Sequence, residues 1–280
     1  MARFVSAYFR LQRKPTEAQV EEELEGLLRE GEKPSPSPKD LPTRLEDRIF
    51  YANEGSGSDI TVFYIHGGGY EHDFSPFHWK FIKKVIAHTD ALVIAPAYRL
   101  IPFGNCQDAF DLIVPLYRDH VRAEPRKKIV LMGDSAGAGL ALALAEHFRA
   151  EKIRTPDELI LLSPWVDVTM ENPRIAEYAG RDPWLTVPWL KVCGRHWAGD
   201  LDLRDPHVSP LFGDCGGLKN VTVFVGTREL FYPDVTRLYE KLEGKGNELV
   251  TGKGMNHVFP ILPIPEAGDA DEKIFAVIKR

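Results

Sequence analysis

The chain has 280 residues, of which 44% are hydrophobic and 27% charged, a composition typical of a soluble globular protein. Its formal net charge of -6, without a long Lys/Arg run, argues against a nucleic acid or an anionic membrane as partner, because both require concentrated positive charge. We therefore expect the partner to be a small molecule.

The N-terminal stretch "MARFVSAYFRLQRKP" has no uninterrupted apolar segment followed by a small-residue cleavage site, and no later segment approaches the length of a membrane span. We therefore expect a cytoplasmic protein without a membrane span. The three cysteines, Cys106, Cys193 and Cys215, are an odd number without metal-ligand spacing, so we expect buried thiols rather than disulfides or a metal site.

The first predicted element is an amphipathic helix that begins after Thr16 and ends at Gly31. Its apolar residues fall at helical spacing: Val20, Leu24, Leu27 and Leu28. The proline-rich "KPSPSPKDLP" that follows cannot continue a helix, because prolines lack amide protons and force their predecessors into extended geometry. We assign residues 1–45 to this N-terminal helix and its linker.

Short runs rich in β-branched and aromatic residues then alternate with helical stretches. The predicted strands are Ile60–Ile65, Ala91–Ala95, Lys128–Met132, Leu159–Leu162, Val221–Val225 and Glu248–Thr251. Because these strands are almost continuously apolar and are separated by helices, they indicate a parallel sheet covered on both faces, an α/β fold.

The alternation of strands and helices is interrupted after Asp167 by a stretch that is rich in proline and tryptophan and contains no clear strand. An insertion of this length at the end of a strand is typical of a lid over a functional site. We therefore divide the rest of the chain into a core, residues 46–167 and 206–280, and a lid insertion, residues 168–205.

The motif "GDSAGAG" places Ser135 between an apolar strand and a helix, with Gly133 and Gly137 two residues away on each side. Such a turn holds a serine in a strained conformation and exposes its hydroxyl at the edge of the sheet, which suits a nucleophile. The alternative is structural, because small residues also occur where a helix packs tightly on a strand.

The motif "YIHGGGY" ends an earlier strand with His66 and three glycines, Gly67, Gly68 and Gly69. Acyl transfer passes through an oxyanion that requires amide donors, and a loop without side chains can bring them close. A phosphate-binding loop is the alternative, but the stretch lacks both the G-x-G-x-x-G spacing and the Lys-Ser/Thr ending.

Taken together, the motifs resemble the hormone-sensitive-lipase-like branch of the α/β-hydrolase carboxylesterases. "HGGGY", "YRLIP", "GDSAGA", "LLSPWVD", "SPL" and "GMNHVFP" occur in the order found in that family, over a region from about Ile60 to the C-terminus. The resemblance implies an α/β-hydrolase fold with a mostly parallel eight-stranded sheet and helices on both faces. It also implies a helical lid, formed by the N-terminal lid helix in residues 1–45 and the insertion at 168–205, and hydrolysis of carboxylic esters.

The resemblance also implies roles for individual residues. Ser135 matches the family's nucleophile and His257, in "GMNHVFP", its general base, while Gly68, Gly69 and the amide of Ala136 match the oxyanion donors. His257 also lies in a glycine-containing loop after the last strand, which is where a triad histidine belongs when the chain order is serine, acid, histidine.

The other histidines are interpreted as structural or peripheral. His66 resembles a structural residue of the glycine loop, and we place the others on the surface or in the lid: His72, His78, His88, His120, His147, His196 and His207. A metal site formed by His66, Glu71 and His72 is disfavoured, because their spacing matches no common zinc signature.

The triad acid is where the sequence departs from the family, which usually has an aspartate after the penultimate strand. Glu229, three residues after Gly226, occupies that position, whereas Asp234 matches a later acidic position. We predict Glu229, since either carboxylate can accept the histidine's Nδ1 proton. The alternatives are a surface ion pair between Glu229 and Arg228, and a helix cap formed by Asp234.

Further residues are assigned around this centre. We expect Trp165 to pack beneath the lid, and Asp108 and Asp134 to form hydrogen bonds behind the catalytic residues. Four aromatic residues either line the substrate pocket or pack in the core: Phe74, Trp184, Trp189 and Phe231.

The sequence thus predicts a serine hydrolase that cleaves small-molecule esters with short to medium acyl chains through an acyl-enzyme, without a cofactor. A formamidase, amidase or deacetylase with the same triad is the nearest alternative. A non-catalytic receptor on the same fold is less favoured, because His257 is present. A homodimer is expected only by family analogy.

Overall fold

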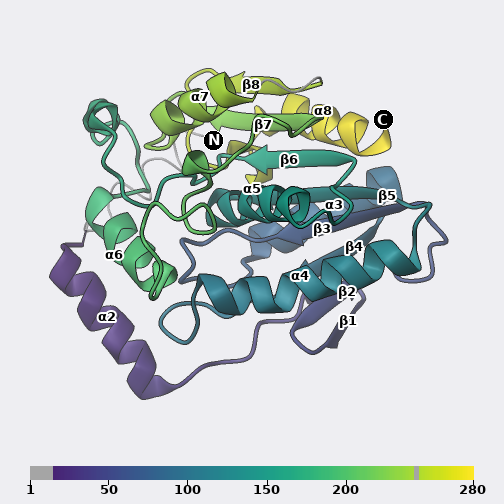
Figure 1. Cartoon of the computed structure of the whole chain (residues 1–280), viewed down its shortest axis with the longest axis horizontal. Coiled ribbons are helices and arrows are strands. Elements are labelled where there is room, and N and C mark those ends of the chain that lie inside the picture. Colours follow the sequence, from purple (N-terminus) through teal and green to yellow (C-terminus); the bar gives the residue numbers. More distant parts are fainter. Residues whose placement is uncertain (1–14, 243–245) are drawn as a thin grey trace.

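A computed structural model describes residues 15–242 and 246–280 of the chain, and its described part contains one eight-stranded sheet (Figure 1). The strands are β1 (Thr43–Glu46), β2 (Ile49–Ala52), β3 (Ile60–Ile65), β4 (Leu92–Pro96), β5 (Lys128–Asp134), β6 (Glu158–Leu162), β7 (Val221–Gly226) and β8 (Glu248–Gly252). Their order is β1-β2-β4-β3-β5-β6-β7-β8. Because only the pairs that involve β2 are antiparallel, the sheet is mostly parallel, as predicted.

Six of these strands lie where the apolar runs predicted them, within one or two residues at each end. The antiparallel hairpin of β1 and β2 was not predicted from the residues. β1 starts at Thr43, so the sheet begins before the boundary that we expected after residue 45. All residues of β1 except Leu45 are polar, and the strand is largely exposed at the edge of the sheet, so it lacks the apolar signal of a buried strand.

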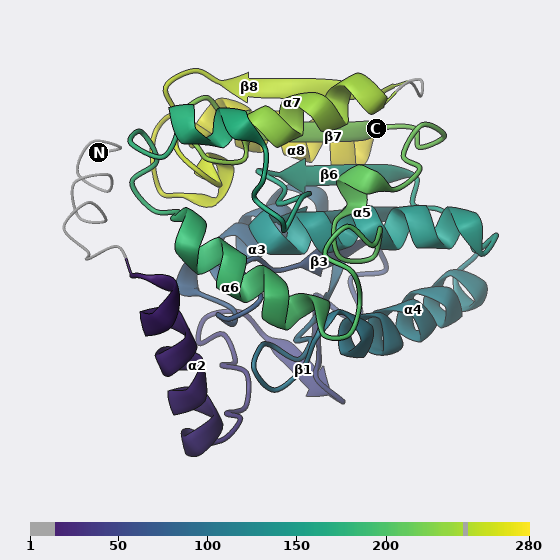
Figure 2. The ribbon, with the colours of Figure 1, turned by 60° about the vertical axis from the view of Figure 1, so that its left-hand side comes forward.

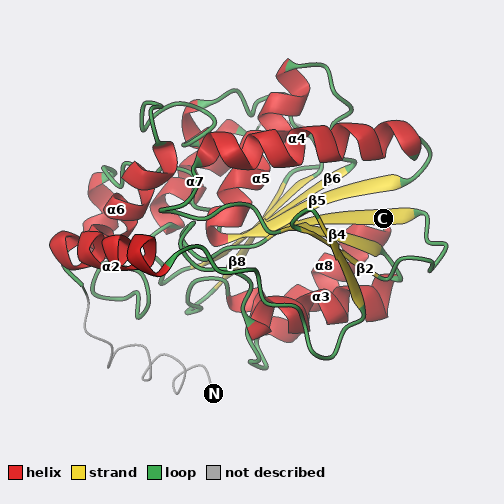
Figure 3. Ribbon diagram, turned by 90° about the horizontal axis from the view of Figure 1, so that it is seen from below, coloured by secondary structure: helices red, strands yellow, loops and turns green. Residues whose placement is uncertain are grey.

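Helices cover both faces of the sheet, which confirms the predicted layering (Figure 3). The helices are α2 (Glu17–Glu30), α3 (Pro76–Thr89), α4 (Cys106–Ala123), α5 (Ser135–Ala150), α6 (Val187–Ala198), α7 (Tyr232–Lys241) and α8 (Ala267–Lys279). In Figure 3, α4, α5 and α7 lie on one face and α3 and α8 on the other. Alternate residues of β5 contribute to two separate cores: Ile129 and Leu131 face the first layer, and Val130 and Met132 the second.

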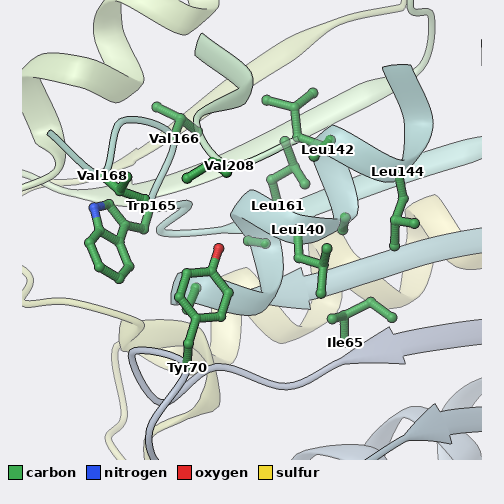
Figure 4. Packing of buried hydrophobic residues seen from close by; sticks show 14 of the residues in the cluster. Ile65, Tyr70, Leu140, Leu142, Leu144, Leu161, Trp165, Val166, Val168 and Val208 are labelled. Atoms are coloured by element: carbon green, nitrogen blue, oxygen red, sulfur yellow. The ribbon is translucent and has the colours of Figure 1, made fainter. Parts of the chain in front are cut away.

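α5 runs along the centre of the sheet and is almost wholly buried. Its residues Leu140 and Leu144 pack in one apolar cluster with Ile65 of β3 and Leu161 of β6, as Figure 4 shows. Gly139 is required by this packing, because a Cβ there would overlap the carbonyl oxygen of Trp165. The close fit fixes α5, and with it the residue at its N-terminus, relative to the strands.

The predicted N-terminal helix is confirmed as α2, which begins after Thr16 and ends at Gly31. The Thr16 hydroxyl accepts a hydrogen bond from the Gln19 amide, and the Gln19 side chain accepts one from the Thr16 amide, so both first-turn donors are satisfied. α2 lies beside α6 rather than on the sheet (Figures 1 and 2). The rest of the predicted N-terminal segment, residues 1–14, is outside the described residues.

The insertion at 168–205 contains α6 and the short 3₁₀ helix η1 (Pro173–Glu177) and no strand, as predicted. It lies on the side of the molecule toward which the parallel strands run (Figure 1). Within residues 15–242 and 246–280, none of the helices combines the length and the apolar character that crossing a bilayer would require.

Candidate active site

Ser135 sits at the sharp turn between β5 and α5 with a backbone φ of +53°, which confirms the predicted strained conformation. The flanking glycines leave no room for side chains. A Cβ at Gly133 would lie 2.5 Å from the carbonyl oxygen of Gly137, and a Cβ at Gly137 would overlap the backbone of Ile65 and His66. The glycine pattern therefore allows the turn to pack against β3, with Ser135 at its apex.

Three side chains predicted as the triad form one continuous hydrogen-bonded chain. Ser135 Oγ lies 2.8 Å from His257 Nε2, and His257 Nδ1 lies 2.5 Å from Glu229 Oε2. The second carboxylate oxygen, Oε1, accepts the amide proton of Gly226 at 2.7 Å. With Nδ1 donating to the carboxylate, Nε2 is left to accept the serine proton.

This chain is almost completely shielded from solvent. The exposed fraction is 8% for Ser135, 3% for His257 and zero for Glu229. Burial raises the pKa of the Glu229 carboxyl, although the hydrogen bonds from His257 and Gly226 act in the opposite direction. A carboxylate held in this setting favours a positively charged imidazole beside it, which is the state that proton transfer from Ser135 creates.

Asp234 lies elsewhere. Its carboxylate accepts hydrogen bonds from Asn172 Nδ2 at 2.7 Å and from Arg237 at 3.1 Å, and the side chain is buried on α7. It forms no side-chain cap either, because α7 begins after Phe231 and its cap has no side-chain hydrogen bond. The alternative for Glu229, a surface ion pair with Arg228, is wrong, since Glu229 is fully buried.

The glycine loop after β3 lies directly against Ser135. A Cβ at Gly67 would be only 2.8 Å from the Ser135 Cβ. Gly68 and Gly69 have φ values of +125° and +64°, in the region that favours glycine, so the loop could not keep this path with larger residues. Ala136 follows Ser135 in the first turn of α5, where amides lack intrahelical acceptors and the helix dipole is positive.

Asp134 links the glycine loop to the sheet, as predicted for a residue behind the site. Its Oδ1 accepts the Tyr64 hydroxyl at 2.7 Å and the Gly67 amide at 3.0 Å, and its Oδ2 lies 3.3 Å from His78 Nε2. Burial alone would raise the pKa of Asp134, but His78 and the other donors outweigh it and lower the pKa. Asp134 is therefore a buried anion that anchors the loop.

Placing His78 on the surface was wrong. Its side chain is buried at the start of α3, where Nδ1 accepts the Ser75 amide proton and the opposite nitrogen faces Asp134. Asp108 also differs from its prediction: its carboxylate accepts the Asn105 amide proton and caps α4. The contact of His78 with Asp134 could not be read from the sequence, because it depends on α3 meeting β5, whereas the cap formed by Asn105 and Asp108 is local to α4.

Two positioning residues were missed. The Ser163 hydroxyl accepts the amide proton of Val258, next to His257, at 2.9 Å. Asp182 of the insertion accepts the amide proton of Leu230, next to Glu229, at 2.9 Å. Ser163 belongs to the motif "LLSPWVD", which was a usable signal, whereas nothing in the sequence around Asp182 indicates its contact.

Aromatic residues of the 168–205 insertion and of the core lie around the triad. The rings of Phe231 and Trp184 lie edge-on to His257, with centroid distances of 5.1 Å and 6.5 Å. Trp165 is buried and stacks against Phe231. Phe74 belongs to the core, where it packs against Phe50, so it does not line the pocket.

Trp189 of α6 contacts the glycine loop. Its six-membered ring occupies the space where a Cβ of Gly69 would be, so the indole lies on the glycine loop. The indole N–H donates to Glu71 Oε2 at 2.6 Å, and the Cys193 thiol lies 3.8 Å from the same oxygen. Glu71 thus links α6 to the segment that carries the glycine loop.

The described residues contain no cluster of three or more metal-ligating side chains. His66 instead is buried, with Nδ1 2.8 Å from the Gly67 carbonyl oxygen, and stacks against Tyr98. The Tyr98 hydroxyl donates to the His66 carbonyl, which gives the motif "YRLIP" a structural role beside the glycine loop. All three cysteines are free and buried, as predicted.

Comparison with known proteins agrees with this architecture. Residues 62–261 match the model of a family described as having the alpha/beta hydrolase fold. Because the match spans most of the chain, the protein belongs to the α/β-hydrolase fold family, as the motifs predicted.

Its relatives include enzymes that act on esters. An esterase of Acinetobacter venetianus is 33% identical over 184 residues, covering 65% of this chain and 61% of that protein. An acetyl-hydrolase of Streptomyces hygroscopicus is 30% identical, covering 72% of this chain and 70% of its own length. The matched region thus spans about three fifths of the first relative and somewhat more of the second.

Solved structures share the whole fold. A Staphylococcus aureus structure, described as a candidate esterase, has a TM-score of 0.86 at 28% identity and covers 97% of this chain and 95% of that one. A hormone-sensitive lipase from a metagenome library has a TM-score of 0.83 at 24% identity, covering 100% and 97% of the two chains. The second likeness supports the fold alone.

Proposed function

We propose that the protein is a carboxylesterase-type serine hydrolase with Ser135, His257 and Glu229 as its catalytic triad. The observation that carries the proposal is the buried chain of hydrogen bonds from the Ser135 hydroxyl through His257 to Glu229, at the ends of three strands of the sheet. The esterases and acetyl-hydrolases among the relatives support the same class of reaction.

In the first half-reaction, His257 Nε2 takes the proton of Ser135 as its oxygen attacks the ester carbonyl carbon. The carbonyl π electrons move to oxygen and form a tetrahedral oxyanion, while Glu229 stabilises the imidazolium. His257 then gives its proton to the departing alkoxide, which leaves as an alcohol, and an acyl-enzyme on Ser135 remains. Water, whose proton His257 takes, then attacks the acyl carbonyl. The bond from the acyl carbon to Ser135 Oγ breaks, the carboxylic acid leaves, and Ser135 Oγ takes the proton back from His257.

The oxyanion is held by the amides of Gly68, Gly69 and Ala136 in this proposal. The contact of the glycine loop with Ser135 and the position of Ala136 at the helix N-terminus support the assignment. Removal of one such donor typically lowers turnover by about a hundredfold or more, so the fixed path of this loop matters for rate.

The proposed substrates are carboxylic esters with short to medium acyl chains. Trp189 on Gly69 brings a large, immobilised ring to the wall beside the oxyanion loop, and Glu71 holds it there. We assign α2 and residues 168–205 to the lid that forms this wall. No cofactor takes part in the proposed steps, and a cytoplasmic location and a homodimer remain predictions of the sequence.

A substrate comparison tests the proposal. Initial rates are measured with p-nitrophenyl acetate, butyrate and decanoate and with p-nitroformanilide, and Ser135→Ala supplies the background. We expect Ser135-dependent hydrolysis of acetate and butyrate, slower decanoate turnover, and formamide rates lower by orders of magnitude. A preference for the formamide would instead identify an amidase, and equal rates for Ser135→Ala would refute the triad.

A further inference from the structure

A cavity of about 790 Å³ opens at the amino-terminal ends of the parallel strands, opposite the triad. It is lined by the first residues of β5 and β6, the loop before β7 and the C-terminal end of α5. Lys128 begins β5 and Ser135 follows its end, so a strand of seven residues, about 20 Å in length, separates the two places. In Figure 1 these amino-terminal strand ends lie on the side of the sheet away from α6.

This basic cavity differs in charge from the rest of the molecule. Seven of its sixteen lining residues are Lys or Arg and only Asp157 and Glu158 are acidic, although the whole chain has a formal charge of -6. Like charges in such proximity repel each other unless they are neutralised. The cations must therefore be compensated within the wall, by solvent ions or by a ligand.

The two acidic residues act as supports within the wall. Glu158 is buried and accepts hydrogen bonds from Arg280, the shorter at 2.9 Å, while Lys128 Nζ lies 3.6 Å away. Asp157 accepts hydrogen bonds from Arg154 at 2.8 Å and from the Ile129 amide at 2.7 Å. Both carboxylates are thereby occupied in orienting three cations.

The other cations have weaker partners or none. Arg149 packs on Gly217, where a Cβ would lie 2.5 Å from its Nε, and binds Asp214, whose side chain is 77% exposed. Arg126 and Lys219 are exposed at the rim, and neither forms an ion pair with any residue in 15–242 or 246–280. Their charges are therefore available to an anion from solution.

We propose that the basic cavity binds a small soluble polyanion that carries at least two phosphate groups. Guanidinium groups match phosphate oxygens in pairs, and several cations around one concavity favour a ligand with more than one phosphate. The volume lies within the range of small-molecule sites, roughly 300–1,000 Å³. Because the wall is charged, its ligand is distinct from the ester that Ser135 would attack.

Isothermal titration calorimetry with pyrophosphate and with inorganic phosphate tests this site on the full chain. We expect pyrophosphate to bind more tightly than phosphate, and its affinity to fall with added salt. The variant Arg126→Glu with Lys219→Glu should weaken pyrophosphate binding by at least about tenfold. Ester turnover on p-nitrophenyl butyrate reports whether the variant is folded.

The matched control is Lys80→Glu with Lys83→Glu on the exposed side of α3, which changes the net charge equally and should weaken binding less than about twofold. Equal losses in both variants, or no binding of pyrophosphate to the unaltered protein, would overturn the proposal. Sedimentation with phosphatidylcholine vesicles, with and without phosphatidic acid, separates a lipid headgroup from a free ligand. Binding to the anionic vesicles alone would contradict a soluble ligand.

Discussion

At the carboxyl-terminal ends of the strands, Ser135, His257 and Glu229 are buried. Glu229 accepts the amide proton of Gly226, and Val258, next to His257, donates its amide proton to Ser163. In the lid, α2 is joined to α6 by side chains that are partly exposed: Arg195 pairs with Glu17 and Glu21, and His196 with Glu21. The triad residues are thus almost fully enclosed, whereas α2 is held by two buried apolar residues, Val20 and Leu24, and by ion pairs that water and salt weaken. We infer that the triad residues at the ends of the strands determine turnover, and that the proposed lid determines which esters are accepted.

The two regions meet at Trp189. Its ring belongs to α6 but lies on Gly69 of the core, and its N–H is bound by Glu71 from the core. Substitutions in the two regions should therefore have separable effects on turnover and on selectivity.

The largest effect is expected at the triad acid. Glu229→Gln should lower kcat on p-nitrophenyl butyrate by roughly 10³- to 10⁴-fold, because the amide neither fixes the histidine tautomer nor stabilises the imidazolium. Asp234 is also buried, on α7, but it contacts Asn172 and Arg237 rather than His257. Asp234→Asn should therefore change kcat by less than about threefold. The reverse order would show that the acid is assigned to the wrong residue.

A pH-dependent weakness is expected within the core, at the far end of α5. Burial raises the pKa of Glu146 to about 8, and both its oxygens lack a hydrogen-bond partner among the described residues. Between about pH 4.5 and pH 8, Glu146 therefore stays protonated in the folded state, whereas the same carboxyl group in the unfolded chain has lost its proton. Stability is lost as the pH rises from about 4.5 through about 8 and is then constant.

Between pH 6 and pH 9, this group alone should lower the free energy of unfolding by on the order of 2 to 3 kcal/mol. Glu146→Gln keeps the shape of the side chain but cannot ionise, so urea unfolding of the variant should lack that part of the pH dependence. If the variant and the unaltered protein lose stability in parallel, Glu146 is ionised at little cost in the fold.

Selectivity for acyl-chain length should depend on Trp189, which is proposed to form one wall of the substrate site. Trp189→Ala opens space beside Gly69, so the ratio of kcat/KM for decanoate to that for butyrate should rise by about tenfold, the effect of roughly two buried methylenes. Glu71→Gln should shift the ratio in the same direction by less, because it weakens the acceptor of the indole N–H. An equal fall in rate on every ester would mean that Trp189 supports the oxyanion loop instead of limiting chain length.

The smallest effect is expected between α2 and α6. Glu21→Gln removes an exposed carboxylate shared by Arg195 and His196, which should cost about 0.5 kcal/mol at low salt and less at high salt. Glu25→Gln is the matched control, because Glu25 pairs only with Arg29 of its own helix among the described residues. Thermal unfolding at two salt concentrations measures both. A loss that does not depend on salt would indicate that packing, rather than charge, holds α2.

The sequence predicted best those parts of the molecule whose structure depends on residues close together in the chain. Apolar runs located the central strands, and the glycines around Ser135 marked the turn because their steric reason lies within the motif and one neighbouring strand. β1 was missed because an exposed edge strand needs no apolar pattern. His78 and Asp182 were misplaced or missed because their burial and contacts arise only when α3 meets β5 and when the insertion folds back on the loop of Glu229.

The central claim is that Ser135 is a nucleophile activated by His257, and covalent labelling tests it most directly. Folded protein is treated with a fluorophosphonate, and intact mass with peptide mapping locates the adduct in the unaltered chain, Ser135→Ala and His257→Gln. The account predicts a single adduct on Ser135, no adduct in Ser135→Ala, and labelling slowed by at least about a hundredfold in His257→Gln. An unlabelled Ser135 in folded protein, or equal labelling of all three chains, would contradict it.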